Sequence, residues 1–175
     1  MTRDDRDGHR LTPATLSKKL DTLRRVNGTV LYLHERDLDD ATVAQVFGDA
    51  ALCPLPSVTF LQLQSNPRLT SAGLSVISRV AENILPALDE INVSYTAVSD
   101  LSPLATVRTL RTIDAIVEQP QRVIELAALP RLKQVTLSTA VASVELHALK
   151  AKKSRRVGLL PYTAMPPRFA DVKPL

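Results

Sequence analysis

The stretch "LDEINVSYTAVSDLSPLA", residues 88–105, decides the fold. Its apolar side chains are Leu88, Ile91, Val93, Val98, Leu101 and Leu104. These residues follow one another at steps of 3, 2, 5, 3 and 3. Neither the period of a strand (about 2) nor that of a helix (about 3.6) fits the whole stretch. The spacing instead predicts a short strand with two inward side chains, followed by a turn and a return segment behind it.

The same pattern recurs along the chain at fixed intervals. Five frames, each apolar at the third and fifth positions after its start, begin at Gly28, Val58, Leu88, Leu110 and Leu132. The first three starts are evenly spaced, and the last three are evenly spaced at a shorter interval. One such unit cannot bury its own apolar edge, whereas stacked units share a continuous core. The sequence therefore predicts a solenoid.

The unit lengths predict what lies behind each strand. A 30-residue unit, as from Gly28 to Val58, has room for a return helix, which we place at 40–47 and 71–80. A 22-residue unit, as from Leu88 to Leu110, has room only for a turn or a short 3₁₀ segment. Before the first frame, Thr12 is a candidate N-cap and Pro13 suits the first helical position. We expect a helix within 12–27 that covers the open end of the array.

Two of these frames resemble leucine-rich repeats. "LxLxxNxxLTxxGLxxI" at 61–77 is similar to the ribonuclease-inhibitor and cysteine-containing classes, and "LxxIxVxxTxVSDLSPLA" at 88–105 to the short class of internalins. The resemblance covers about 28–149 and implies an α/β solenoid. It implies about five parallel strands on a concave face and helices or 3₁₀ turns on the convex face.

The family's asparagine, whose side chain bridges neighbouring turns, is present here only as Asn66. Thr96 is the one easy substitute among the equivalent positions of the other frames. We therefore expect an irregular inner turn in the first, fourth and fifth frames. The division into regions that follows is 1–11 disordered or extended, 12–27 capping helix, 28–149 repeat array, and 150–175 a basic, proline-rich, extended tail.

Composition narrows the setting of the protein. The chain has 175 residues, 45% hydrophobic and only 3% aromatic, which is typical of one globular domain with an aliphatic core. The net charge of +4 is too small to indicate nucleic-acid binding by itself. Cys53 is the single cysteine, and we expect it to be a small buried apolar residue. With no membrane-length apolar stretch or secretory signal, a cytoplasmic, reducing location is expected.

Motifs for chemistry are weak, and an enzyme is not expected. There is no phosphate-binding glycine loop, and the three histidines do not have metal-ligand spacing. The acidic group "HERDLDD", residues 34–40, is the best metal or acid–base candidate, but a helix cap at Asp39 or Asp40 explains it better. Ser99 and Asp100 are interpreted as turn or cap residues. We predict no catalytic residue, no metal site and no cofactor.

Function is expected on the strand side chains that alternate with the buried ones. This face is polar, has no Lys or Arg, and carries two aromatic residues of the kind favoured in protein interfaces. The predicted partner-binding residues are Tyr32, His34, Phe60, Gln62, Gln64, Glu90, Asn92, Ser94, Asp114, Gln134 and Thr136. A second predicted contact is the basic run of the tail, formed by Lys150, Lys152, Lys153, Arg155 and Arg156.

Three functions remain open. The favoured one is a non-enzymatic scaffold or adaptor, a structural subunit of a larger, for instance cytoskeletal or axonemal, assembly; the resemblance adds that small leucine-rich proteins often serve this way. The alternative is an RNA-associated subunit of a ribonucleoprotein that uses the basic run at 150–156 and the capping-helix cations Lys18, Lys19, Arg24 and Arg25. The third is a substrate-recognition adaptor for ubiquitination, for which the segment before the first repeat at Gly28 is short. No membrane or small-molecule partner is expected.

Overall fold

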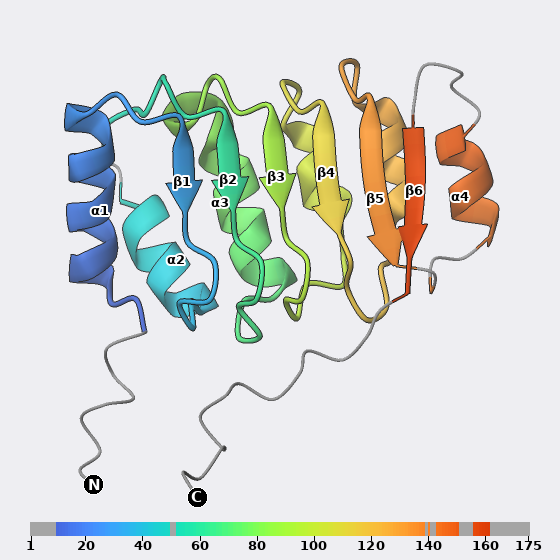
Figure 1. Ribbon diagram of the computed structural model, residues 1–175, viewed down its shortest axis with the longest axis horizontal. Helices are drawn as coiled ribbons and strands as arrows, with labels where there is room; N and C mark the ends of the chain where they lie inside the picture. Colours follow the sequence, from blue (N-terminus) through green and yellow to red (C-terminus); the bar gives the residue numbers. More distant parts are fainter. Residues whose placement is uncertain (1–9, 50–51, 139, 141–142, 151–155, 162–175) are drawn as a thin grey trace, which may run out of the picture.

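The computed structural model describes residues 10–49, 52–138, 140, 143–150 and 156–161. Within them the chain is an α/β protein with one open sheet of six parallel strands, ordered β1 to β6 as they occur in the sequence (Figure 1). The strands are β1 (Val30–Tyr32), β2 (Phe60–Gln62), β3 (Glu90–Asn92), β4 (Thr112–Ala115), β5 (Gln134–Ser138) and β6 (Arg156–Leu160).

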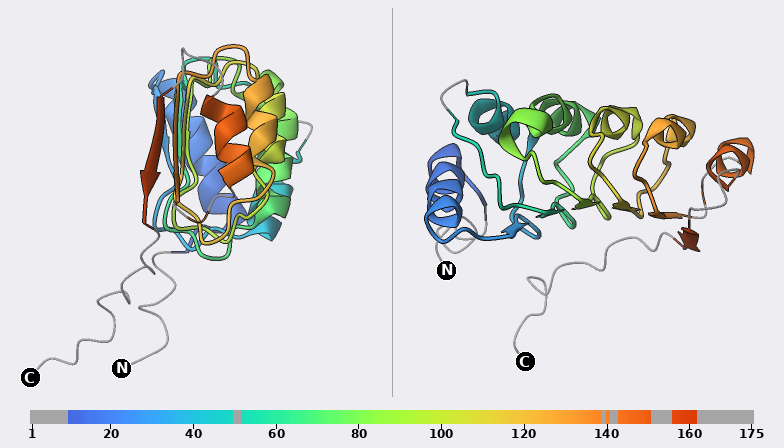
Figure 2. Two further views of the ribbon diagram at one scale, coloured as in Figure 1. Left: turned by 90° about the vertical axis from the view of Figure 1, so that its right-hand side faces the viewer. Right: turned by 90° about the horizontal axis from the view of Figure 1, so that it is seen from above.

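Helices lie along one face of this sheet or at its ends (Figure 2). They are α1 (Pro13–Arg25), α2 (Asp40–Phe47), α3 (Ser71–Ile84), the 3₁₀ segments η2 (Ser102–Thr106) and η3 (Val123–Ala128), and α4 (Ser143–Lys150). Seen from above, α2, α3, η2 and η3 form a row behind the strands, and α1 stands at the β1 end of the sheet (Figure 2). No described helix covers the opposite face, which we call the open face.

The register of the sheet follows the spacing in the sequence. Leu31 pairs with Leu61, which pairs with Ile91, and the steps then shorten through Ile113 and Val135. The two inward residues predicted for each of the five frames are all 0% exposed. They are Leu31, Leu33, Leu61, Leu63, Ile91, Val93, Ile113, Ala115, Val135 and Leu137.

The predicted helices are largely confirmed. Helix α2 has the expected bounds, whereas α3 begins at the expected Ser71 and runs on to Ile84 rather than stopping at 80. Helix α1 begins at Pro13, and its N-cap Thr12 accepts a hydrogen bond from the Thr15 N–H. The first two short steps hold only the 3₁₀ segments η2 and η3.

The expectation of about five strands is wrong, because the segment taken for an irregular tail supplies β6. This strand pairs with β5 in parallel, with Arg156 opposite Gln134, which repeats the short step a third time. That step also holds the eight-residue α4, so a short unit is not limited to a turn or a 3₁₀ segment. Pro161 does not prevent the strand, since β6 ends before it and lies at the sheet edge, where proline is tolerated.

Asn66 bridges two turns of the chain. Its side chain is fully buried, its Oδ1 accepts hydrogen bonds from the Arg36 and Leu38 N–H groups, and its Nδ2 donates to the Leu33 and Leu63 carbonyls. All four distances lie between 2.8 and 3.1 Å. The amide therefore satisfies buried backbone groups that no strand ladder reaches.

Cys53 corrects another expectation, because its side chain is exposed rather than buried. It lies in the connection between α2 and β2, where Leu55 is 2% exposed and fills the apolar position. The small size of Cys53 favours a core position, but Leu55, two residues later, occupies that position in the structure.

Candidate functional site

The open face is built by the strand side chains that alternate with the buried ones. Because the strands are parallel and in register, each such side chain has a neighbour at the same level on the next strand. The middle row across β1 to β5 is Tyr32, Gln62, Asn92, Asp114 and Thr136. Tyr32 is 49% exposed and the other four are half-buried, so the row is accessible and most exposed at its β1 end.

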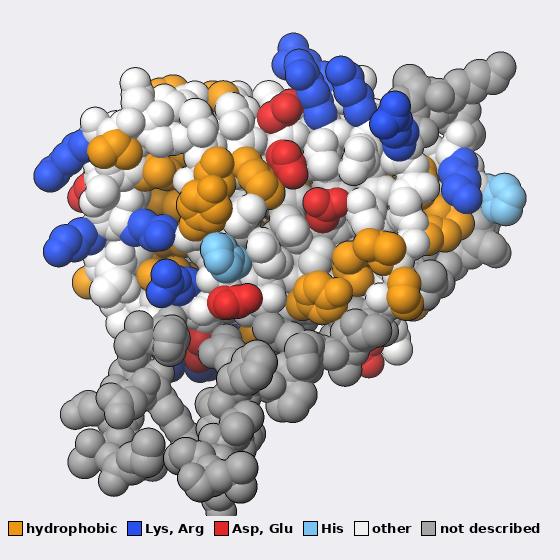
Figure 3. All heavy atoms as spheres, viewed as in Figure 1, with side chains coloured by type: hydrophobic (Ala, Val, Ile, Leu, Met, Phe, Trp, Pro, Cys, Tyr) orange, Lys and Arg blue, Asp and Glu red, His pale blue; other side chains and the backbone are white. Residues whose placement is uncertain are grey.

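Aromatic and polar residues gather at the β1 and β2 end of this face. The Tyr32 and His34 rings meet edge to face with their centroids 5.9 Å apart. On β2, the half-buried Phe60 lies next to Val30 of β1. Figure 3 shows hydrophobic side chains and a histidine clustered here, beside Lys and Arg side chains at the β1 end of the sheet. This combination of apolar area and polar edge is typical of protein interfaces.

Two buried polar atoms lie at the same end of the open face, on residues that follow the last residues of β1 and β2. The Nδ1 atom of His34 and the Oε1 atom of Gln64 are buried and lack a hydrogen-bond partner within the described residues. The two residues are in register, since the neighbouring Glu35 N–H donates to the Gln64 carbonyl at 3.1 Å. An unsatisfied buried polar atom is costly, so hydrogen bonds from a partner at this point would be favourable.

The centre of the open face is acidic. The Glu90 carboxyl lies near the carboxyls of Asp114, on the next strand, and of Asp89, the preceding residue. Burial raises the pKa of the Glu90 carboxyl, and the negative charges of Asp114 and Asp89 raise this pKa further. Asp89 itself pairs with Arg111 at 3.1 Å. The face therefore changes in character from aromatic at β1 to acidic at β3 and β4, as Figure 3 shows.

Ser94 does not belong to the accessible face, contrary to expectation. It is only 3% exposed, its N–H donates to Asn92 Oδ1, and its Oγ accepts from the Ile116 N–H. The strand has already begun to turn at this residue, so its hydroxyl joins two neighbouring turns. Every other predicted residue of this face, including Gln134 and Thr136 of β5, is exposed or half-buried.

The acidic group at 34–40 is used within the structure. Asp39 caps α2 by accepting from the Thr42 N–H, and it pairs with Arg10 at 2.6 Å. The hydrogen bond from Thr42 is the main cause that holds the pKa of Asp39 below its usual value. Asp40 Oδ1 accepts from the Thr70 and Gly73 N–H groups and so joins α2 to the start of α3. Within the described ranges, no three His, Cys, Asp or Glu side chains are grouped as metal ligands would be.

The basic run is split between two elements. Lys150 is exposed at the end of α4, and Arg156 begins β6 in register with Gln134, so a cation stands at the far edge of a face expected to have none. Lys152, Lys153 and Arg155 lie outside the described residues. Sequence reasoning missed β6, although one more short step from the last frame start puts Val157 and Leu159 at its inward positions.

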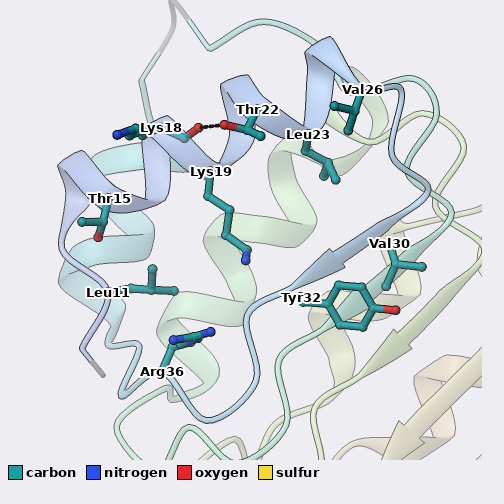
Figure 4. Close-up of a pocket in the computed structure, with 10 residues that line it drawn as sticks. All are labelled: Leu11, Thr15, Lys18, Lys19, Thr22, Leu23, Val26, Val30, Tyr32 and Arg36. Carbon is teal, nitrogen blue, oxygen red and sulfur yellow. Dashed lines mark hydrogen bonds between the residues drawn. The ribbon is translucent and has the colours of Figure 1, made fainter. Parts of the chain in front are cut away.

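A groove between α1 and β1, which we call the edge groove, is a further feature that sequence reasoning missed. It has a volume of about 470 Å³ and opens to solvent. Its lining includes Leu11, Lys19, Leu23, Val30, Tyr32 and Arg36 (Figure 4). The sequence offers only the cations of the capping helix, such as Lys19, which do not reveal that the helix stands away from the sheet.

No family model matches the chain, and no curated protein matches it. Among the described residues, no helix has the length and apolar character needed to span a membrane.

Proposed function

We propose that this chain is a leucine-rich-repeat solenoid that acts as a non-enzymatic, protein-binding scaffold, a structural subunit of a larger assembly. The observation that carries the proposal is the open face. All described helices lie on the other side of the sheet or at its end, and strands at about 4.8 Å spacing present a surface roughly 20 Å wide across β1 to β5.

The chemistry of this face favours a protein partner. Tyr32 is half exposed and its ring contacts that of His34, while Phe60 lies on the same face beside Val30. Aromatic residues of this kind supply much of the energy of protein interfaces. His34 Nδ1 and Gln64 Oε1, which have no partner among the described residues, add points where a peptide backbone or side chain gains hydrogen bonds. The regular stepping of buried leucine, isoleucine and valine, together with the bridging Asn66, supports the repeat family.

A site-specific crosslinking experiment tests this function. A photo-crosslinking amino acid is placed at Asn92 on the open face, and in a matched control at Ala72, which is exposed on α3. We expect one defined protein to be crosslinked from position 92 and not from position 72. Tyr32→Ala, in the chain carrying the crosslinker at 92, should weaken binding of that protein about tenfold or more.

The control for this experiment is the thermal unfolding midpoint, which should change little in Tyr32→Ala because the ring is half exposed. Equal crosslinking from both positions, or none from position 92, contradicts the proposed use of the open face.

The ribonucleoprotein alternative has less support. Of the cap-helix cations, Arg24 is engaged with Asp21 at 2.7 Å and with the Cys53 carbonyl. The centre of the open face is acidic at Glu90 and Asp114, which repels phosphates. RNA binding that falls steeply with salt and depends on Lys150 and Arg156 would favour this alternative.

A further inference from the structure

Strand β1 has one edge that no other strand of the described chain covers. The Leu33 N–H donates to the carbonyl of Gln62, the last residue of β2, and the Glu35 N–H to the carbonyl of Gln64 just after it. The backbone groups of the odd-numbered residues therefore face the sheet. In a parallel ladder the intervening residues point their N–H and C=O groups to the opposite side. The backbone groups of Val30, Tyr32 and His34 therefore face the outer edge of the sheet.

The chain already uses this outer edge once. The Leu11 N–H donates to the Arg36 carbonyl at 2.9 Å, just before α1 begins. An extended segment can therefore form a backbone hydrogen bond at this edge. Beyond Leu11 the chain turns into α1, which packs against α2 and leaves the edge groove beside β1.

The length of the edge groove suits an extended peptide. One wall of the groove runs from β1 (Val30–Tyr32) into the turn that holds Arg36. The opposite wall is α1, whose 13 residues span about 20 Å at about 1.5 Å per residue. About six residues of extended chain, at about 3.3 Å each, match the length of α1.

The two ends of the edge groove differ in chemistry. Leu23, Val26 and Val30 lie together near the end of α1 and the start of β1, whereas the side chains of Lys19 and Arg36 lie toward the other end, near Leu11 (Figure 4). No described acidic side chain forms an ion pair with either cation. Burial and, to a smaller extent, the nearby Arg36 lower the pKa of the Lys19 ammonium.

We propose that the edge groove binds an extended, amphipathic acidic segment of a partner protein, which adds to the sheet as a strand beside β1. Aliphatic residues of this segment contact Leu23, Val26 and Val30, and its carboxylates pair with Lys19 and Arg36. Its backbone hydrogen-bonds with the outer groups of Val30 and Tyr32, as in other cases of strand addition. This site is separate from the open face of the proposed function, although Val30 and Tyr32 border both.

Peptide binding to the full chain tests the proposal. The probes are two fluorescent peptides of about nine residues, long enough to span the groove at about 3.3 Å each, with the sequence Val-Thr-Val-Thr-Val-Glu-Asp-Glu-Asp and its reverse. One order places its carboxylates at the cationic end in a parallel strand and the other in an antiparallel strand. We expect one order to bind saturably, and the same peptide with Lys in place of each acid not to bind.

Four further readouts test the two parts of the proposal, charge pairing and strand addition. Lys19→Gln and Arg36→Gln should each weaken binding up to about fivefold, whereas Arg79→Gln, the same charge change on exposed α3, should have no effect. The Val30 and Tyr32 amides should become protected from hydrogen exchange on binding, and the pKa of Lys19 should rise. Peptides N-methylated at alternate residues should lose binding in one methylation phase and retain it in the other.

Several results would overturn the proposal. One is no saturable binding of either order; another is binding without protection of the two amides. Equal or tighter binding of an oligouridine that depends on Lys19 and Arg36 would assign the groove to nucleic acid instead. Binding only to a variant lacking residues 1–9, which include Asp4, Asp5 and Asp7, would assign it to the chain's own segment. A loss of open-face crosslinking from position 92 bears on the proposed function and leaves this result unaffected.

Discussion

The first half of the sheet (β1 to β3) and the second half (β3 to β6) differ in the number of residues from one strand to the next, but the strand register is the same in both. From β1 to β3 each 30-residue step, as from Leu31 to Leu61, holds a full helix, α2 or α3. From β3 to β6 each 22-residue step, as from Ile91 to Ile113, holds η2, η3 or α4, which at eight residues is as long as α2. In both halves the inward side chains of β1 to β5 are fully buried. The pairing of the strands therefore determines how the units stack, whereas the connecting segments differ in length and in secondary structure.

The halves also differ in how their inner turns are joined. In the long-step half, Asn66 bonds to backbone groups of its own turn and of the turn before it. In the short-step half, Thr96 at the equivalent position bonds only within its own turn, to the Val93 carbonyl and from the Val98 N–H. The contact between turns is made there by Ser94, which accepts from the Ile116 N–H. The long-step half thus depends more on a single side chain.

The largest effect is expected for Asn66→Ala. Because the substitution leaves the Leu33, Leu38 and Leu63 backbone groups buried without partners, we expect the free energy of unfolding to fall by about 4 kcal/mol. Thr96→Val, which removes one strong hydrogen bond at the same level, should cost about 1 kcal/mol. Urea unfolding of both variants measures the difference, and equal losses would show that the two turns are joined alike.

A pair of glycines tests how tightly each half is packed. A Cβ on Gly73 would collide with Asp40 Oδ1 and lie 2.6 Å from Leu69 Cδ1, so Gly73→Ala should lower the free energy of unfolding by about 2 kcal/mol. A Cβ on Gly158 in β6 would meet nothing closer than Thr136 at 3.8 Å. Gly158→Ala should therefore change stability by about 0.5 kcal/mol or less. A larger loss at Gly158 than at Gly73 would reverse this view of the two halves.

The cap of α2 makes the long-step half sensitive to acid. Folding lowers the pKa of the Asp39 carboxyl. The stability that this carboxylate contributes is therefore fully present above the pKa of Asp39 in the unfolded chain, and it is lost as pH falls through the pKa of Asp39 in the folded protein. We expect Asp39→Ala to cost about 1 kcal/mol at neutral pH and almost nothing at pH values below the folded pKa. Unfolding curves of wild type and variant across this acidic range measure the convergence. A constant difference would mean that the carboxylate charge is not involved.

The smallest effect is expected at the boundary between the halves. Glu90 has a raised pKa, so its ionisation disfavours the folded state, and this cost appears as pH rises from the unfolded to the folded pKa. Glu90→Gln should stabilise the protein by about 0.5 kcal/mol at neutral pH and by nothing in acid, as urea unfolding at the two pH values would measure. Asn92→Asp, which adds a carboxylate beside Asp114, should have the opposite sign; stabilisation by both would exclude repulsion as the cause.

Much of the fold could be predicted from spacing, because burial repeats whenever backbone position repeats. The inward residues of β1 to β5 and the bounds of α2 follow from this rule. Strand β6 follows the same spacing but carries a weaker burial signal in the sequence, since its edge position leaves Leu159 38% exposed and its neighbours are lysine, arginine and proline.

The candidate site was less predictable. Alternation placed Tyr32, Gln62 and Asn92 on an accessible face, but it could not tell that the strand turns at Ser94 and buries it. The edge groove depends on the angle and distance of α1 from β1, which tertiary packing on α2 determines and no local pattern encodes.

The three equal short steps have an evolutionary consequence. Since β4, β5 and β6 each pair with the preceding strand at the same offset, duplication or loss of one such segment in the gene leaves every remaining strand aligned with its neighbours. The breadth of the surface between the ends of the molecule can then change in whole increments without redesign of the core. Lineages that carry this gene are expected to differ by multiples of this length rather than by single-residue insertions within the strands.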